Sequence, residues 1–270
     1  MPDYADLEAR ARRIRANVVR MAHRGKEGHL QGALSCVDIL TALYGGWLRG
    51  KPGDPERDRL YFSKGHACAA LYATWAEFGL IDPALLETYA QPGSPLTSHP
   101  DKGLMLLLEM SAGSLGHGLG YAAGAAYGLR LRGSEARCVA LLSDGECNEG
   151  SVWEAAMFAA AQGLGNLTCI VDANGMQSVA THRAVNGKTS LARKFEACGW
   201  VTQEVNGHDF SSLHFGLSSR RRGHGVPFAI IAHTTPGKGV SFMEQSPDAL
   251  WHYRVPSDED LAAALKELAA

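Results

Sequence analysis

The chain has 270 residues, of which 46% are hydrophobic and 20% charged, so it is long enough to build a substantial core. Its formal net charge of -2 gives no electrostatic basis for binding nucleic acid or an anionic membrane, and we expect neither partner. The N-terminus lacks a signal sequence and no apolar run approaches the roughly 20 residues that span a bilayer, which favours a cytoplasmic protein.

The first half of the chain is predicted to contain several helices and one short strand. Residues 7–22 carry apolar side chains at helical spacing and should form an amphipathic helix. A second helix, capped by its first residue, is predicted over residues 35–47. A short strand is expected at residues 60–62 and a third helix at residues 67–78. The Gly- and Ala-rich residues 116–131 are predicted to form a buried helix.

The second half of the chain contains the runs that are most typical of parallel strands. These short runs are rich in Val, Ile and Leu, as in a sheet that is covered on both faces, and they span residues 138–143, 167–173, 200–205 and 227–233. Further helices are predicted at residues 151–162, 188–197 and 258–268. This alternation predicts an α/β fold, a doubly wound and mainly parallel sheet with helices on both faces. Since no linker or repeat is evident, residues 1–270 are expected to form one domain.

Two polar residues end neighbouring predicted strands. Asp144 follows residues 138–143, and Asn174 follows residues 167–173, with a helix-length segment between the two. Such a unit places both carboxyl ends at one edge of the sheet, where open α/β folds bind ligands. A carboxylate and an amide oxygen can then share a hard cation with phosphate oxygens and water. The pattern predicts a magnesium diphosphate site, whereas the simpler alternative is two polar residues that merely end strands.

Four histidines lie beside glycine or proline in predicted loops, at His29, His66, His99 and His117. A lone histidine in a loop is often a surface group, but several at one edge of a sheet favour a role in proton transfer or ligand binding. Zinc is not expected, because there is no His-Glu-x-x-His motif and no Cys/His cluster with zinc spacing. The six cysteines are widely scattered and are interpreted as reduced core residues.

The glycine-rich residues 113–120 open a predicted helix and superficially suggest a dinucleotide-binding loop. Their spacing does not match Gly-x-Gly-x-x-Gly cleanly, and no acidic residue ends the next strand about 20 residues on. Asp144 lies farther along the chain. NAD binding is therefore not predicted, and the glycines are also explained if they let a helix pack closely on the sheet.

Five ordered motifs, one of them in two parts, together resemble the transketolase family. Residues 143–155, SDGECNEGSVWEA, followed by residues 171–176, VDANGM, look like the thiamine diphosphate motif of that family. The other similar segments lie at residues 28–35, 57–67, 98–101 and 109–119, in the order of the family's N-terminal half. The similarity runs from about residue 14 to residue 252, nearly the whole chain.

The resemblance implies that thiamine diphosphate binds through Mg²⁺, with Ca²⁺ as an alternative. Asp144, Asn174 and the backbone carbonyl of Met176 would hold the metal, and the Gly145 N–H would meet the diphosphate. The implied catalytic residues are His29, His66, His99 and His252. Of these, His29 and His99 would face the reacting carbonyl and hydroxyl groups and exchange protons with them. The implied cofactor-binding residues are His66, Gly113, Ser114, Leu115, Gly145, Glu146, Glu149, Asn174 and His252.

Some residues depart from the family pattern. Ser143 replaces a glycine, His117 stands where glutamine is common, and Tyr253 follows His252 where many relatives have glycine. The roles of His117 and Tyr253 are left open. Glu149 and Glu154 keep the pattern, which implies a carboxylate network at a subunit interface.

The family resemblance also implies a partner. Full-length transketolases carry a pyrimidine-binding domain, with an activating glutamate, and a C-terminal domain, and 270 residues leave no room for either. We therefore expect a second subunit that carries both domains, in a heterotetramer with two copies of each chain.

The expected reaction is the transfer of a two-carbon ketol unit from a ketose to an aldehyde acceptor, with small sugars or carbonyl compounds as substrates. Two alternatives stay open at this point. The chain could be the alpha subunit of a 2-oxo-acid dehydrogenase, which shares the cofactor motif, or a non-catalytic binding subunit that keeps the fold.

Overall fold

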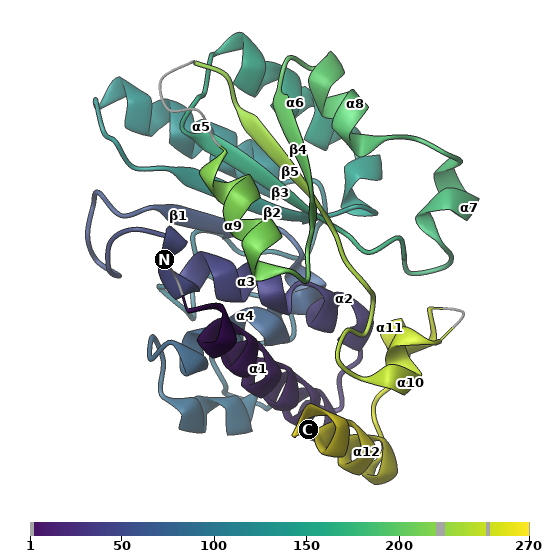
Figure 1. Cartoon of the computed structure of the whole chain (residues 1–270). Coiled ribbons are helices and arrows are strands. Elements are labelled where there is room, and N and C mark those ends of the chain that lie inside the picture. The colour runs from purple at the N-terminus through teal and green to yellow at the C-terminus, as the bar shows by residue number, and fades with distance from the viewer. Residues whose placement is uncertain (1–2, 220–224, 247–248, 270) are drawn as a thin grey trace.

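The computed structural model describes residues 3–219, 225–246 and 249–269 of the chain (Figure 1). Within these residues the central sheet has the strand order β1-β2-β3-β5-β4, and its strands are β1 (Arg59–Phe62), β2 (Cys138–Ser143), β3 (Leu167–Ala173), β4 (Val201–Asn206) and β5 (Phe228–His233). All neighbouring strands pair in parallel. The predicted parallel α/β sheet is confirmed, and the carboxyl ends of the strands share one edge.

Helices lie on both sides of the sheet, as Figure 1 shows. One side carries α1 (Tyr4–Gly25), α2 (Leu30–Ser35), α3 (Val37–Ala42), α4 (Cys68–Glu77), α9 (Phe210–Ser218) and α12 (Asp258–Leu268). The other side carries α5 (Gly118–Leu131), α6 (Gly150–Ala161) and α8 (Leu191–Ala197). The shorter helical segments are η1 (Leu43–Trp47), η2 (Gly65–Ala67), η3 (Pro83–Thr88), η4 (Glu146–Asn148), α7 (His182–Asn186), α10 (Ser241–Glu244) and α11 (Leu250–Tyr253).

The central strands divide their side chains between two hydrophobic cores. In β2, Val139 and Leu141 belong to the core that contains α1 and α4. Ala140 and Leu142 alternate with them and belong to the core that contains α5 and α6. Because both faces of the strand are buried, its sequence is a continuous apolar run rather than an alternating one. This explains why β2 and β3 were predicted with the correct ends.

The prediction of one helix over residues 35–47 is wrong. The helical path begins earlier, with α2, and is interrupted at Cys36 before α3 and η1. Gly46, with a φ of 127°, lies outside helical geometry. Ser35 caps no helix, because its hydroxyl contacts the buried carboxylate of Asp172. A tertiary contact at the end of β3 has therefore replaced the predicted local one.

The helix predicted over residues 116–131 is α5, but the expectation that it is buried holds for one face only. Leu119 and Ala122 are fully buried against the sheet. Tyr121 and Leu131 are 59% and 69% exposed, so the opposite face of α5 has no cover in the described part of the chain. An apolar composition thus did not distinguish a core helix from a helix with one uncovered apolar face.

The remaining predicted elements are present, with ends shifted by a few residues at most. Helices α7 and α9 were not predicted. Within the described ranges, no helix combines the length and the apolar character that crossing a lipid bilayer requires. All six cysteines are free thiols, and Cys198 alone among them is not buried.

Candidate active site

Asp144 and Asn174, the two side chains that are expected to bind the metal, follow adjacent strands at the carboxyl edge of the sheet. Ser143 is in register with Asp172, so the tips of β2 and β3 are adjacent. The Gly175 N–H donates a 2.7 Å hydrogen bond to Asp144 Oδ2, which links the loops that follow the two strands. The Gly145 N–H donates to the other carboxylate oxygen at 2.8 Å. Both loops are therefore organised around the Asp144 carboxylate.

The environment of Asp144 suits a bound cation. The residue is 3% exposed, and within the described residues it forms no ion pair. Burial, and next the charge of Asp172, raise the pKa of Asp144 to about 6. A buried carboxylate without a directly bound cation is destabilised, and a divalent ion beside it would remove that cost. A carboxylate with an amide and a backbone carbonyl is also the all-oxygen donor set that Mg²⁺ and Ca²⁺ prefer.

Asn174 and Met176 occupy one tight turn after β3. The Met176 N–H donates a 2.9 Å hydrogen bond to Asn174 Oδ1, and Asn174 Nδ2 donates to Ser35 Oγ at 3.1 Å. Among the described residues, no group of three or more His, Cys, Asp or Glu side chains is placed to hold a metal ion. A metal bound at Asp144 would therefore depend on amide, carbonyl, phosphate and water oxygens for its other ligands.

The four predicted catalytic histidines come together from four separate segments of the chain. His29 lies at the centre, and its ring centroid is 5.7 Å from that of His66, 5.9 Å from that of His99 and 4.8 Å from that of His252. The backbone N–H of His29 also donates a 2.9 Å hydrogen bond to the backbone carbonyl of His252, which ties α11 to the start of α2. His29 adopts a left-handed backbone, with a φ of 61°, a conformation that is uncommon outside glycine and occurs at functional sites.

Three of these histidines, His29, His66 and His252, have lowered pKa values that favour the neutral form. Burial, then the neighbouring His252 and His99, lower the pKa of His29 to about 4. Burial and the charge of Lys64 lower the pKa of His66 well below its ordinary value. The same two causes lower the pKa of His252. Neutral imidazoles can both accept and donate hydrogen bonds at pH 7, as ligands of phosphate and hydroxyl groups must.

The loop at residues 113–115 borders this cluster. A Cβ on Gly65 would lie 2.9 Å from the backbone nitrogen of Gly113, so glycine is required for the loop to approach η2 so closely. A Cβ on Gly113 would in turn lie 3.8 Å from the His99 ring. Gly113 and Ser114 are exposed, and Leu115 is partly so. The three residues thus form an accessible wall beside His66 and His99.

Glu146 is fully buried and uses its carboxylate within the protein. Its oxygens accept hydrogen bonds from the Ser63 hydroxyl, from the Gly116 N–H at 2.8 Å and from the Ser143 N–H at 3.3 Å. Ser63 Oγ in turn accepts a hydrogen bond from the N–H of Gly118. Glu146 therefore joins the ends of β1 and β2 to the loop that precedes α5.

Glu149 and Glu154 lie near the uncovered face of α5. Glu154, Tyr121 and Phe158 line an open cavity of about 860 Å³ between α5 and α6, and His117 lies at its edge. Glu149 is exposed and follows η4. Both glutamates are thus reachable from outside this chain.

Sequence reasoning missed a fully buried ion pair behind the metal ligands. Lys64 Nζ donates to Asp172 Oδ2 and, at 3.0 Å, to the carbonyl of Gly32, and neither charged side chain is exposed. The Ser35 and Thr234 hydroxyls also donate to Asp172. The sequence feature that could have indicated this ion pair is Asp172, an aspartate inside the otherwise apolar residues 167–173.

Comparisons with known proteins agree with this geometry. Residues 7–266 match the family profile "Transketolase, thiamine diphosphate binding domain". A relative from Actinobacillus succinogenes, named as one of the subunits of an apulose-4-phosphate transketolase, is 39% identical over 98% of this chain and 96% of its own length. A relative from a Clostridium species, called 6-deoxy-6-sulfo-D-fructose transketolase subunit SqwG, is 36% identical over 88% of both chains.

Among solved structures, a transketolase from Campylobacter jejuni superimposes with a TM-score of 0.87 at 27% identity. The alignment covers 97% of this chain but 42% of that transketolase. The present chain therefore corresponds to less than half of the solved protein.

Proposed function

The chain belongs to the transketolase family, whose thiamine diphosphate-binding domain it matches over nearly its whole length, and we propose that it is the cofactor-binding subunit of a two-chain transketolase. The observation that carries the proposal is that the linked Asp144 and Asn174 loops and a cluster of four histidines lie at one edge of the sheet. In this proposal residues 1–270 form a single pyrophosphate-binding domain.

The residues of this chain would divide the work between cofactor and substrate. Asp144, Asn174 and the carbonyl of Met176 would hold Mg²⁺ or Ca²⁺ against the diphosphate, with the Gly145 N–H as a further donor. Bound thiamine diphosphate supplies the nucleophilic carbon and the electron sink that ketol transfer requires.

The histidine cluster would act on the diphosphate and on the sugar. Neutral His66 and His252 would donate ring N–H hydrogen bonds to phosphate oxygens. His29 and His99 would take up or return protons at the substrate hydroxyl and carbonyl oxygens. Gly113, Ser114 and Leu115 would form the wall beside the aminopyrimidine, and Glu146 would hold that wall in place through the N–H of Gly116.

The proposal includes a partner chain with the pyrimidine-binding and C-terminal domains, in a cytoplasmic heterotetramer. Two relatives that align over most of their length are called transketolase subunits, and the solved transketolase is more than twice as long as the aligned region. The uncovered apolar face of α5 and α6, with Glu149 and Glu154 beside it, is available for the contact between chains. The substrates would be a ketose donor and an aldehyde acceptor, as the sugar names of the two relatives suggest.

The test is a ketol-transfer assay of the chain and its candidate partner, separately and mixed, with thiamine diphosphate and Mg²⁺. We expect activity from the mixture and none from either chain alone, because each would hold half of the cofactor site. His99→Ala in the mixture should lower kcat by about 100-fold or more, since general acid–base groups contribute on this scale. Activity of this chain alone would refute the two-chain proposal, and turnover of pyruvate with a lipoyl acceptor would instead favour a 2-oxo-acid dehydrogenase.

A further inference from the structure

The side-chain amide of Asn174 presents two chemically different ends, and only its oxygen can bind a metal. Nδ2 donates to Ser35 Oγ at 3.1 Å, while Oδ1 accepts the Met176 N–H at 2.9 Å. Which end faces the metal is therefore decided by the hydrogen-bond partners of the amide. Asn174 follows β3 directly, so its Cα is fixed by the sheet and the orientation of the amide is left to Ser35 and the Met176 N–H.

The Ser35 hydroxyl has one proton and can donate it to only one of two nearby acceptors. Its oxygen lies 2.6 Å from Asp172 Oδ2 and 3.1 Å from the carbonyl of Gly32, both of which are acceptors. The single hydroxyl proton goes to the charged and closer Asp172, because charge-assisted hydrogen bonds are the stronger ones. The lone pairs of Ser35 Oγ are then left to accept from Asn174, which must turn its nitrogen toward Ser35 and its oxygen away.

Asp172 is itself held in place. Its carboxylate is fully buried and accepts from Lys64 and Ser35 at Oδ2 and from Thr234 at Oδ1. The Lys64 ammonium keeps this carboxylate from being an uncompensated buried charge. The order of donors and acceptors that starts at Asp172 and passes through Ser35 to Asn174 is thus fixed by burial and charge.

We propose that Ser35 is a positioning residue for the metal, which holds the Asn174 amide with its oxygen toward the cation. The inference rests on the proposed function, because it takes Asn174 as a metal ligand. Groups that orient a metal ligand from behind commonly change metal affinity about 10- to 100-fold when they are removed. Without the Ser35 hydroxyl the amide is held by the Met176 N–H alone. Its rotation then costs one hydrogen bond fewer, and part of the population presents NH₂ to the cation.

The experiment uses the chain assembled with its partner and titrates Mg²⁺ at a fixed, saturating concentration of thiamine diphosphate. Calorimetry gives the Kd of Mg²⁺, and a separate assay gives kcat. Ser35→Ala should raise the Mg²⁺ Kd by about 10- to 100-fold, while kcat at saturating Mg²⁺ changes by less than about threefold. The conservative Ser35→Cys is slightly larger and keeps a weaker donor and acceptor, and its Mg²⁺ Kd should fall between those of the unchanged protein and Ser35→Ala.

The matched control is Thr234→Val, which removes a hydrogen bond to the other oxygen of the same carboxylate and leaves the bond between Ser35 and Asn174 in place. Its Mg²⁺ Kd should stay within about threefold of the unchanged protein, since groups outside the ligand's own support contribute little. In an Asn174→Asp background Ser35→Ala should also have little effect, because a carboxylate presents oxygen from either end. Thermal unfolding checks that every variant is folded.

Three results would overturn the role of Ser35. The first is an unchanged Mg²⁺ Kd in Ser35→Ala. The second is a loss of Mg²⁺ affinity in Thr234→Val that equals the loss in Ser35→Ala. The third is an equal loss of Mg²⁺ affinity when Ser35→Ala is introduced in the Asn174→Asp background. Failure of the proposed function has a different signature, because the unchanged protein would then show no Mg²⁺-dependent binding of thiamine diphosphate at all.

Discussion

Glu146 shows how one buried carboxylate can organise the loops of a candidate site. Its two oxygens satisfy the Ser63 hydroxyl and the backbone N–H groups of Gly116 and Ser143. Burial raises the pKa of Glu146, yet these three donors, together with the more distant Lys64, favour the charged form. Every donor belongs to a different segment, so the carboxylate holds the strand ends and the loop at residues 113–116 together.

Glu146→Gln should therefore destabilise the isolated chain by about 1–3 kcal/mol, measured by urea unfolding. The side-chain amide of the introduced glutamine has one acceptor oxygen where the carboxylate has two. Its NH₂ group would therefore face a backbone N–H that needs an acceptor. Glu149→Gln is the matched control, because Glu149 is exposed and its substitution should change the free energy of unfolding by about 0.5 kcal/mol or less. Equal effects of the two substitutions would mean that Glu146 does not hold the loop.

At the scale of single residues, the sequence predicted the ends of strands better than it predicted the contacts behind them. Asp144 and Asn174 could be found because each follows an apolar run directly. Ser35 was interpreted as a helix cap, since serine is a common cap, but its partner Asp172 lies 137 positions away in the sequence. Such a long-range contact leaves no local pattern, and only the pairing of β3 with its neighbours brings it about.

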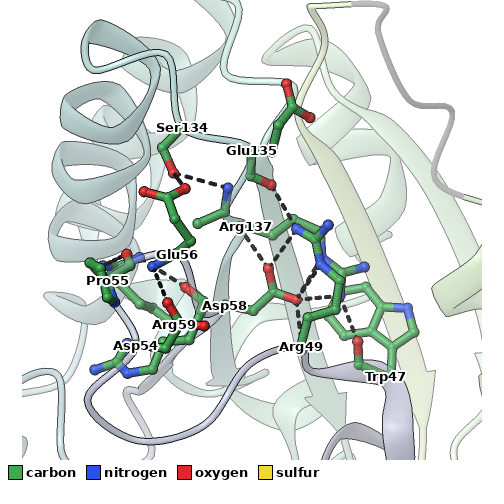
Figure 2. A network of polar contacts seen from close by, with 12 residues as sticks. Trp47, Arg49, Asp54, Pro55, Glu56, Asp58, Arg59, Ser134, Glu135 and Arg137 are labelled. Atoms are coloured by element: carbon green, nitrogen blue, oxygen red, sulfur yellow. Dashed lines mark hydrogen bonds and ion pairs between the residues drawn. The ribbon is translucent and has the colours of Figure 1, made fainter.

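Among the elements, β1 and β2 are joined at their amino ends by a cluster around Asp58 (Figure 2). The Asp58 side chain is fully buried, and it accepts hydrogen bonds from the backbone N–H groups of Arg49 and Arg137 at 2.9 and 2.8 Å. The guanidinium groups of both arginines also bind it, and that of Arg137 lies 3.9 Å from the centre of the Trp47 ring. This edge is opposite to the candidate active site and links the edge strand to the rest of the sheet.

The Asp58 cluster should make stability depend on pH. Burial alone would raise the pKa of Asp58, but the hydrogen bonds from Arg137 and Arg49 outweigh it and lower the pKa to about 2. A lowered carboxyl pKa contributes stability that is fully present above the unfolded-state value, near 4, and is lost as the pH falls toward 2. Asp58→Asn should cost about 2–3 kcal/mol at pH 7, and the difference should shrink between pH 4 and pH 2.

Chemical unfolding across pH 2–7 measures this difference. Asp54→Asn is a suitable control, because Asp54 lies in the same loop and is exposed. Its unfolding free energy should follow that of the unchanged chain at every pH. A cost of Asp58→Asn that is constant across the whole range would contradict the lowered pKa.

The helices differ in how readily they are predicted, and the cause is the pattern that each one carries. Helix α12 was predicted with both ends from its composition and period, and the structure shows a complete capping box at its start, at Ser257 and Asp260. Helix α5 was recognised, but its uncovered face was not, because small apolar residues give the same pattern whether they contact a core or another chain. Helix α7 was missed, and it has no buried residue from which a pattern could arise.

At the scale of the whole molecule, the chain is an α/β unit whose proposed catalytic groups all lie at one edge of the sheet. The apolar outer face of α5 and α6 has no cover within the described residues. The four histidines belong to segments that are up to 223 positions apart, from His29 to His252, and the sheet brings them together. The sequence alone could not have given their distances, although the resemblance to transketolases implied their roles. The remaining half of the proposed site would come from a second chain.

The proposal that this chain clamps the diphosphate through a metal is tested most directly by the affinity of the assembled complex for thiamine diphosphate, measured by calorimetry with Mg²⁺ and with a chelator. We predict binding in Mg²⁺ and a loss of about 100-fold or more in chelator, because the diphosphate would then meet the Asp144 carboxylate with no cation between them. A similar loss is expected in Asp144→Ala with Mg²⁺ present, because the metal would lose the one charged ligand of the proposed set. Equal affinity with and without the divalent ion, or an unchanged affinity in Asp144→Ala, would contradict the proposal that this chain clamps the diphosphate through a metal.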